Sequence, residues 1–340
     1  MGYVDKFRQR RKPDSRVLDT IYSASLSYDI IKQCVSEVLG LSELEITEQY
    51  IDEANLVEWF EHMEDTLESK LFNLYFKPEL VNGTNLPEGG AMLVANHSGM
   101  FAWDGLSVGY TIWKETGRAF LGVGHTLFDK SNFLKSIGAI GGDRDLVVKL
   151  LKEDRYVFAF PGGIKETTKP FWKRYKVQHE GGFAPGNYGY LLVALEAKKP
   201  VVPLGVVGAE ETHIQLGDVK PYFDSVISRT YSRLPSVVQK KAKRYKEIWD
   251  VSKRVPIMLN LIPFPSKITV LAGEPIHFKE MQGVVSPQRV LGLRNKEDLS
   301  YKEKKELSYL EAILDSMNNR VLSQIQYLID TGRSFKRLLG

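Results

Sequence analysis

The sequence predicts an α/β fold with a mostly parallel central sheet covered by helices, a helical N-terminal segment and a C-terminal amphipathic helix. After Pro78, short β-branched or apolar runs alternate with helical stretches, which is typical of a parallel sheet. Two of these runs lack polar alternation, as strands buried on both faces do. Near the C-terminus, apolar residues keep helical spacing over 302–328.

The predicted elements follow in chain order. Apolar residues recur at helical spacing over about 17–39 and 53–75, which predicts helices before the sheet. The predicted strands are Ala91–Ala95, Tyr156–Phe160, Val201–Val207 and Ser266–Leu271. The predicted helices are Asp104–Thr116, Leu146–Glu153, Tyr188–Lys198 and the long amphipathic helix Lys302–Leu328. We therefore expect a basic tail with a helical segment (1–76), an α/β domain (77–280) and a C-terminal linker with its helix (281–340).

Composition excludes several classes of protein. Of the 340 residues, 43% are hydrophobic and 26% charged, which excludes a wholly disordered chain. The one cysteine, Cys34, excludes an intramolecular disulfide framework and a cysteine-rich zinc module. The longest windows without Asp, Glu, Lys or Arg span 15 residues, Gly89–Trp103 and Gly181–Leu195. A spanning helix needs about 20, so no transmembrane helix is expected.

The first candidate for chemistry follows the strand that ends at Ala95. Polar residues appear there at once, among them His97. Ligands of open α/β sheets bind at the carboxyl ends of the strands, so His97 stands where a general base belongs. Asp104, near the start of the next helix, is suited to hold the imidazole in one tautomer and to stabilise its protonated form. The alternative is a His–Asp pair with a structural role.

Two further candidates also lie in turns. Gly162 and Gly163 follow the second predicted strand and let the main chain approach a ligand, where N–H groups cradle an oxyanion or phosphate. A plain strand-to-helix turn is the alternative. Arg144 presents a guanidinium suited to bidentate phosphate binding. A surface salt bridge with Asp143 or Asp145 is the alternative there.

Taken in order, these motifs resemble the four sequence blocks of the glycerolipid acyltransferase superfamily, which includes the lysophospholipid (1-acylglycerol-3-phosphate) acyltransferases. The matching blocks are Asn96-His97 with Asp104, then Gly141–Arg144, Phe160–Gly163 and Val201–Leu204. The resemblance spans roughly residues 75–280. Four blocks in the right order are far more specific than any one of them.

The resemblance implies transfer of a fatty acyl group from acyl-CoA or acyl carrier protein to a glycerolipid hydroxyl, first of all that of a lysophospholipid such as lysophosphatidic acid. His97 is then the general base, Asp104 orients it, and Pro203 shapes the acyl site. The residues implied to bind the acceptor and its phosphate are Arg144, Gly162, Gly163, Lys165 and Glu166. Beyond the thioester co-substrate, no cofactor is expected. The histidines show no metal-ligand spacing such as H-E-x-x-H, so no metal site is expected either.

The sequence departs from the family pattern in two places. The usual first block is H-x-x-x-x-D, whereas six residues separate His97 from Asp104, and a bulged turn through Ser98 is expected to absorb the difference. The third block is usually F-P-E-G, but Gly162 replaces the glutamate, and Glu166 is placed to supply the lost carboxylate. Family branches that act on neutral glycerides also carry a diglycine. A mono- or diglyceride or a long-chain alcohol is therefore the alternative acceptor.

Two rival functions remain beside acyl transfer. One is a catalytically inactive, lipid-binding relative, and the stretched spacing between His97 and Asp104 is the feature in its favour. The other is a hydrolase in which His97 activates water. That function gives no reason for the basic residues Arg144 and Lys165.

Basic residues beside apolar ones indicate a membrane surface as a partner. The basic N-terminal tail is either solvated or an arm on anionic lipid. The basic run Lys240–Lys246 leads into the apolar run Val255–Phe264, which is typical of an interfacial anchor, with a buried core segment as the alternative. A nucleic-acid partner is not expected, because the net charge is only +4 and the four blocks point elsewhere. We expect a cytoplasmic protein that associates peripherally with membrane.

Overall fold

The computed structural model describes residues 57, 61, 67–98, 103–124, 138–177, 187–218, 220–240, 242–243, 256–260 and 262–339. The helix predicted at 17–39 and most of the one at 53–75 lie outside these residues. The chain divides into two units, and the α/β unit comprises Ile46–Gly217 and Met258–Gly340. It holds every residue predicted for the site. Asp218–Ile257 belongs to the other unit. The boundaries predicted at 76 and 280 stay a prediction.

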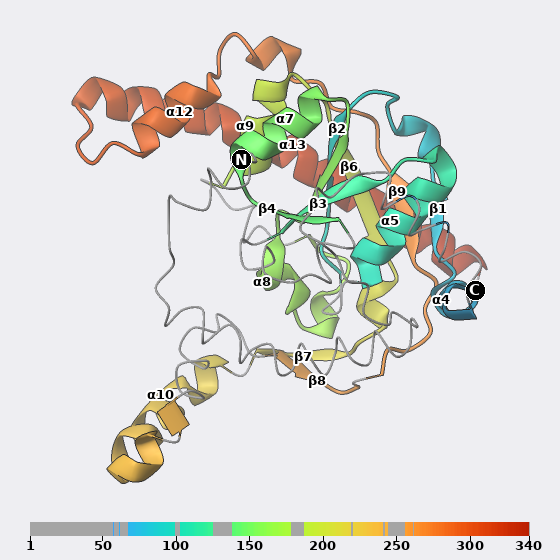
Figure 1. Cartoon of the computed structure of the whole chain (residues 1–340), viewed down its shortest axis with the longest axis vertical. Coiled ribbons are helices and arrows are strands. Elements are labelled where there is room, and N and C mark those ends of the chain that lie inside the picture. The colour runs from blue at the N-terminus through green and yellow to red at the C-terminus, as the bar shows by residue number, and fades with distance from the viewer. Residues whose placement is uncertain are drawn as a thin grey trace, which may run out of the picture. The chain divides into compact units, whose positions relative to one another are not determined.

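Seven strands form the central sheet, in the order β1-β9-β6-β2-β5-β3-β4 (Figure 1). They are β1 Glu79–Val81, β2 Ala91–Ala95, β3 Phe120–Gly124, β4 Ala139–Gly141, β5 Tyr156–Ala159, β6 Val201–Val207 and β9 Thr269–Ala272. Every neighbouring pair is parallel except β6 and β9, which are antiparallel. The predicted mostly parallel sheet is therefore confirmed.

The helices of the described residues include the four predicted at Asp104–Thr116, Leu146–Glu153, Tyr188–Lys198 and Lys302–Leu328, with shifted ends, and three that were not predicted, at 163–167, 220–233 and 287–294. The helices are α4 Leu67–Phe76, α5 Trp103–Thr116, α7 Arg144–Lys152, α8 Gly163–Thr167, α9 Gly189–Ala197, α10 Lys220–Arg233, α12 Pro287–Arg294 and α13 Tyr301–Leu339. Short 3-10 turns occur at Gly83–Asn85, Phe171–Lys173, Ala209–Glu211 and Lys279–Met281. Helix α7 begins two residues earlier than predicted because the Asp143 side chain caps it, accepting the Leu146 N–H at 3.0 Å.

Three strands of the sheet were not predicted from the sequence. Strands β1, β3 and β4 are three to five residues long, and β3 and β4 contain glycine, which is depleted in strands. Each pairs with a neighbouring strand: β1 with β9, β3 with β5 and β4 with β3. A separate two-stranded sheet joins β7 Gln215–Asp218 to β8 Pro256–Met258.

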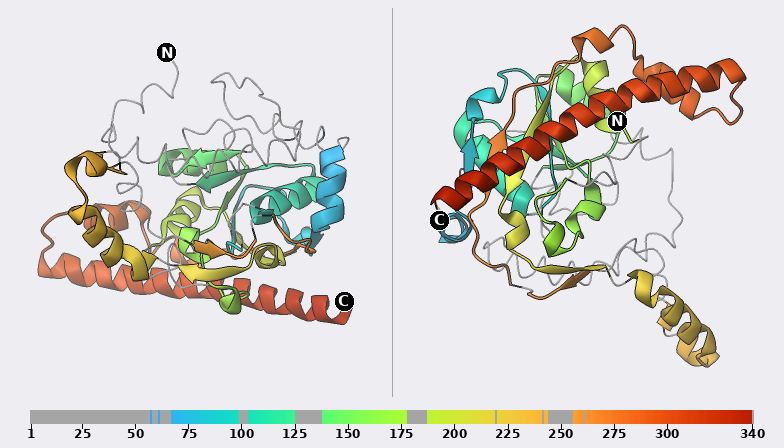
Figure 2. Two further views of the ribbon diagram at one scale, coloured as in Figure 1. Left: turned by 90° about the horizontal axis from the view of Figure 1, so that it is seen from below. Right: turned by 180° about the vertical axis from the view of Figure 1, so that it is seen from behind.

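Helix α13 crosses the sheet and packs on β6 and β9 (Figure 2). Its buried side chains keep helical spacing: Leu310, Leu314, Met317, Val321, Ile325 and Leu328. The helix approaches the sheet closely, because a Cβ added at Gly205 of β6 would lie 2.6 Å from Cβ of Leu328. The predicted amphipathic helix is thus confirmed, and it covers the sheet beyond its predicted end.

The order of the strands brings two predicted turns together. Strands β2 and β5 are parallel neighbours, with Val94 opposite Ala159. Both strands end within one residue of this pair. The polar residues after β2 and the glycine turn after β5 therefore leave the sheet side by side, at the edge where parallel sheets bind ligands.

Candidate active site

Asn96 fixes the point at which the polar loop leaves β2. Its side chain is fully buried. Its Nδ2 donates to the Val206 carbonyl at 3.0 Å, and its Oδ1 accepts the Val206 N–H at 2.8 Å. The amide thereby satisfies the backbone groups of β6 where the ladder from β2 ends. The residue after it, His97, leaves the sheet from a fixed position.

The predicted pair of His97 and Asp104 is in contact. Nδ1 of His97 lies 2.7 Å from Oδ2 of Asp104. The Asp104 side chain is 0% exposed, whereas that of His97 is 19% exposed. Asp104 also accepts the Ser98 N–H at 2.7 Å and the Gly105 N–H at 2.8 Å. The six residues between His97 and Asp104 therefore do not keep the pair apart.

These contacts determine how the imidazole is presented. An ionised carboxylate only accepts hydrogen bonds, so we assign the proton to Nδ1 of His97 and a lone pair to Nε2. Asp104 lies in the first turn of α5, where the helix dipole favours negative charge. Phe160 stacks on the imidazole with ring centroids 4.0 Å apart and an interplanar angle of 8°. A ring held at one edge and on one face is suited to take a proton.

The glycine turn after β5 supports the backbone of His97. Glu166 of α8 is fully buried, and its Oε2 accepts the His97 N–H at 3.0 Å. Gly162 leaves room for this carboxylate, because a Cβ added there would lie 2.8 Å from Cδ of Glu166. Gly163 has φ +54°, in the left-handed region that favours glycine. The carboxylate of Glu166 thus fills the space beside residue 162, which supports the interpretation that it replaces the family's glutamate.

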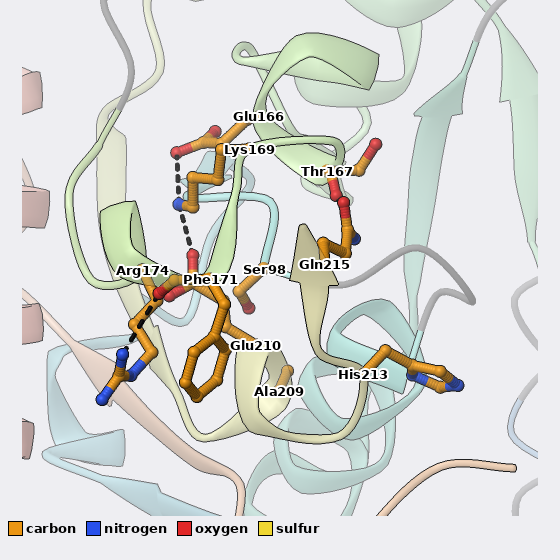
Figure 3. A pocket seen from close by; sticks show the side chains of 10 residues that line it. All are labelled: Ser98, Glu166, Thr167, Lys169, Phe171, Arg174, Ala209, Glu210, His213 and Gln215. Atoms are coloured by element: carbon orange, nitrogen blue, oxygen red, sulfur yellow. Dashed lines mark hydrogen bonds and ion pairs between the residues drawn. The ribbon is translucent and has the colours of Figure 1, made fainter. Parts of the chain in front are cut away.

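Glu166 belongs to a buried cluster of charged groups (Figure 3). Nζ of Lys169 lies 3.8 Å from Oε1 of Glu166 and forms an ion pair with Glu210. Burial raises the pKa of Glu166 to about 7, although Lys169 and the His97 N–H act against it. Burial also raises the pKa of Glu210, against the effect of Lys169. Two carboxyl groups share one ammonium group, so the cluster holds a proton near neutral pH.

A small polar pocket lies beside this cluster, and sequence reasoning missed part of its lining (Figure 3). Ser98, His213 and Gln215 line it together with Glu166 and Lys169. Among the described residues, Ser98 Oγ and Gln215 Oε1 are buried without a hydrogen-bond partner. The pocket therefore offers hydroxyl, amide and ammonium groups to a polar ligand. No motif in the sequence marks Gln215, which reaches this place through β7.

The remaining residues predicted for the site are Arg144, Pro203 and Lys165. The Arg144 guanidinium pairs with Glu196 of α9 and lies 3.5 Å from Asp145, so the ion pair expected as its alternative role is present. Pro203 is buried within β6. Lys165 belongs to α8, and its side chain is outside the described part of the structure. Phosphate binding by Arg144 and Lys165 and an acyl-site role for Pro203 stay predictions.

The described residues contain neither a metal-binding cluster nor a helix that could cross a membrane. Within those ranges, no group of three or more His, Cys, Asp or Glu side chains is placed to hold a metal ion. In the same part of the chain, no helix has the length and apolar character needed to cross a membrane.

Comparison with known proteins adds a family match. The model of the family described as Acyltransferase matches residues 77–207. An uncharacterized protein of Mycobacterium tuberculosis (strain ATCC 25618 / H37Rv) is 26% identical, over 76% of this chain and 68% of the relative. One of Mycobacterium leprae (strain TN) is 28% identical, over 61% and 52%. The crystal structure of the 1-acyl-sn-glycerophosphate (LPA) acyltransferase, PlsC, from Thermotoga maritima is similar with a TM-score of 0.38 and 14% identity, over 90% of this chain and 96% of that one.

Proposed function

We propose, from the premise that residues 77–207 form an acyltransferase-family domain, that this chain transfers a fatty acyl group from an acyl thioester to a glycerolipid hydroxyl. The observation that carries the proposal is the 2.7 Å contact between His97 Nδ1 and the buried Asp104 carboxylate. It leaves Nε2 of His97 as the base at the carboxyl end of β2. In this proposal the donor is acyl-CoA or acyl carrier protein.

The proposed reaction follows from the state of the imidazole. Nε2 of His97 takes the proton of the acceptor hydroxyl while the hydroxyl oxygen attacks the thioester carbonyl. Asp104 stabilises the imidazolium that forms. The tetrahedral intermediate then expels the thiolate, which receives the proton from His97. One ester bond forms, one thioester bond breaks, and no acyl-enzyme is required.

For the acceptor we propose a lysophospholipid such as lysophosphatidic acid, with Arg144 and Lys165 at its phosphate. A neutral acceptor, a mono- or diglyceride or a long-chain alcohol, is the second candidate. It is favoured by the ion pairs of Arg144 with Glu196 and Asp145, which engage the guanidinium that a phosphate would need. We further propose that the protein works peripherally at a membrane surface, because the acceptor and the acylated product of this reaction are lipids.

Thiol release from palmitoyl-CoA tests the proposal with purified protein. Lysophosphatidic acid, other lysophospholipids, diglyceride and no acceptor are compared. We expect acceptor-dependent release that falls about 10²- to 10⁴-fold in His97→Ala, the usual contribution of a positioned general base. The exposed His277 provides the matched control, His277→Ala, which should stay close to wild type.

Other outcomes contradict the proposal. Release without any acceptor would identify a hydrolase. If palmitoyl-CoA gives no release, the assay is repeated with acyl carrier protein as donor. Transfer from neither donor would favour a lipid-binding protein without catalysis.

A further inference from the structure

Exposed apolar side chains lie on the segment that follows β8 and on the neighbouring strand β7. Four large hydrophobic side chains of the α/β unit are exposed there: Leu216 is 40% exposed, Leu259 63%, Ile262 78% and Phe264 47%. We call these four residues the apolar patch. A core segment would bury such side chains, so the core interpretation of the run 255–264 is wrong for its described residues.

The apolar patch stands on a loop that is held by hydrogen bonds. The Leu259 N–H donates to the Ile214 carbonyl at 3.0 Å. The Asn260 side chain accepts the Ile214 N–H at 2.9 Å and donates to the carbonyls of Thr212 and Ile262 at 2.8 and 2.7 Å. The loop is thus built to present its apolar side chains outward. Several large apolar side chains exposed on one hydrogen-bonded loop and the strand beside it are typical of a site of interaction.

The segment that supports the apolar patch also lines the polar pocket. His213 and Gln215 are buried and belong to the lining of the pocket, as Ser98 does. Leu216, the next residue of β7, is exposed, as the alternation of side chains along a strand requires. Gln215 of this strand therefore meets the pocket next to His97, and Leu216 on its other face belongs to the patch.

The charge of the chain indicates which partner covers the apolar patch. Residues 240–254, which lead into β8, contain seven Lys or Arg and two Asp or Glu, a net charge of +5 against +4 for the whole chain. Anionic lipid headgroups attract basic segments, and apolar side chains enter the boundary between headgroups and acyl chains. A stable protein interface uses about 20–30 residues on each side, many more than this patch provides.

We propose that Leu216, Leu259, Ile262 and Phe264 insert into the interface of an anionic membrane. Docking there brings the pocket-lining segment against the lipid, so that a lipid substrate reaches the site from the membrane. Only this last step rests on the proposed function. Binding of the membrane itself requires no catalysis.

Vesicle sedimentation tests the docking surface with the full-length protein. The vesicles contain phosphatidylcholine alone or with phosphatidylglycerol, and we expect wild-type protein to bind the anionic ones more tightly. Ile262→Asp should weaken that binding about 10-fold or more, because one inserted side chain loses its apolar transfer and gains a charge that repels anionic lipid. Since Ile262 is exposed, the variant is expected to fold. Tyr309→Asp, at a residue of α13 that is 61% exposed, is the matched control.

Three results would overturn the proposal. Ile262→Asp could bind vesicles as tightly as wild type, or Tyr309→Asp could lose as much binding as Ile262→Asp. A wild-type dimer that Ile262→Asp converts to monomer in sedimentation velocity would assign the patch to a second copy of the chain. Thiol release from detergent-dispersed substrates is scored separately. Protein that binds vesicles through the patch but transfers no acyl group would contradict the proposed function and leave the docking surface standing.

Discussion

Two of the turns that hold residues predicted for the site, those after β2 and β4, differ in how their side chains are held. The turn after β2 joins His97 to a carboxylate that also accepts two backbone N–H groups. The turn after β4 begins α7 with Arg144, whose partners are Glu196 and Asp145. The first arrangement is complete without substrate. The second has to open an ion pair before it meets a phosphate.

Burial explains why the two arrangements differ in how firmly they hold their side chains. The Asp104 side chain is 0% exposed, and leaving a buried polar group without its hydrogen-bond partner costs about 1–3 kcal/mol, and more for a charged group. The side chain of Asp145 is 73% exposed, and exposed ion pairs contribute about 0–1 kcal/mol. We therefore expect the His97 pair to keep its geometry, whereas the contact between Arg144 and Asp145 opens at little cost. A strand end places a group near the site, but buried partners fix its orientation.

Asp104→Asn should have the largest effect, because it changes the hydrogen bonds of the first turn while keeping its shape. An amide nitrogen facing His97 favours the wrong tautomer of the imidazole. We expect acyl transfer, measured as thiol release, to fall about 10²- to 10⁴-fold. Asp145→Asn, at the second turn, is the matched control and should stay close to wild type. Full activity of Asp104→Asn with an unchanged circular dichroism spectrum would show that the buried carboxylate does not serve His97.

Glu166→Gln should change how stability depends on pH. The pKa of Glu166 is about 7 in the folded protein, against an ordinary value of 4.5. Between these values the folded protein binds a proton that the unfolded chain has lost, so the free energy of unfolding falls as pH rises. Over the whole window the fall is about 3 kcal/mol. The variant should remove most of it, as measured by urea unfolding at about pH 5 and pH 8.

The exposed Glu297 provides the control for this experiment. Glu297→Gln should keep the wild-type difference between the two pH values. The same difference in Glu166→Gln would assign the proton to another group of the buried cluster, with Glu210 the first candidate because burial raises its pKa too.

Local sequence patterns predict some parts of the site and leave other parts unmarked. The turns after β2 and β5 could be predicted because each motif directly follows a buried apolar run, and their side-by-side arrangement follows from the parallel sheet. His97 and Asp104 meet across one strand–helix connection. Ser98 and Gln215 instead meet through two distant segments of the chain, so no local pattern marks the pocket. Strand β3 escaped prediction because it pairs without a strong strand pattern of its own.

Arg144→Ala should have the smallest effect and applies to the second turn. A hydrogen bond to a charged group is worth about 1.5–3 kcal/mol, and opening the ion pairs reduces this gain. We therefore expect the apparent KM for lysophosphatidic acid to rise about 10-fold, while the KM for diglyceride stays nearly unchanged.

Glu196→Gln completes the comparison between the two turns, because it removes the carboxylate that competes with phosphate for Arg144. If Arg144 binds the acceptor, this variant should lower the KM for lysophosphatidic acid in the same assay. Equal changes of KM with both acceptors would give Arg144 a structural role, as a tie between α7 and α9. In that case the site would have no arginine that binds phosphate and no glutamate at residue 162. It would then resemble a site for a neutral lipid, and diglyceride or a long-chain alcohol would become the expected acceptor.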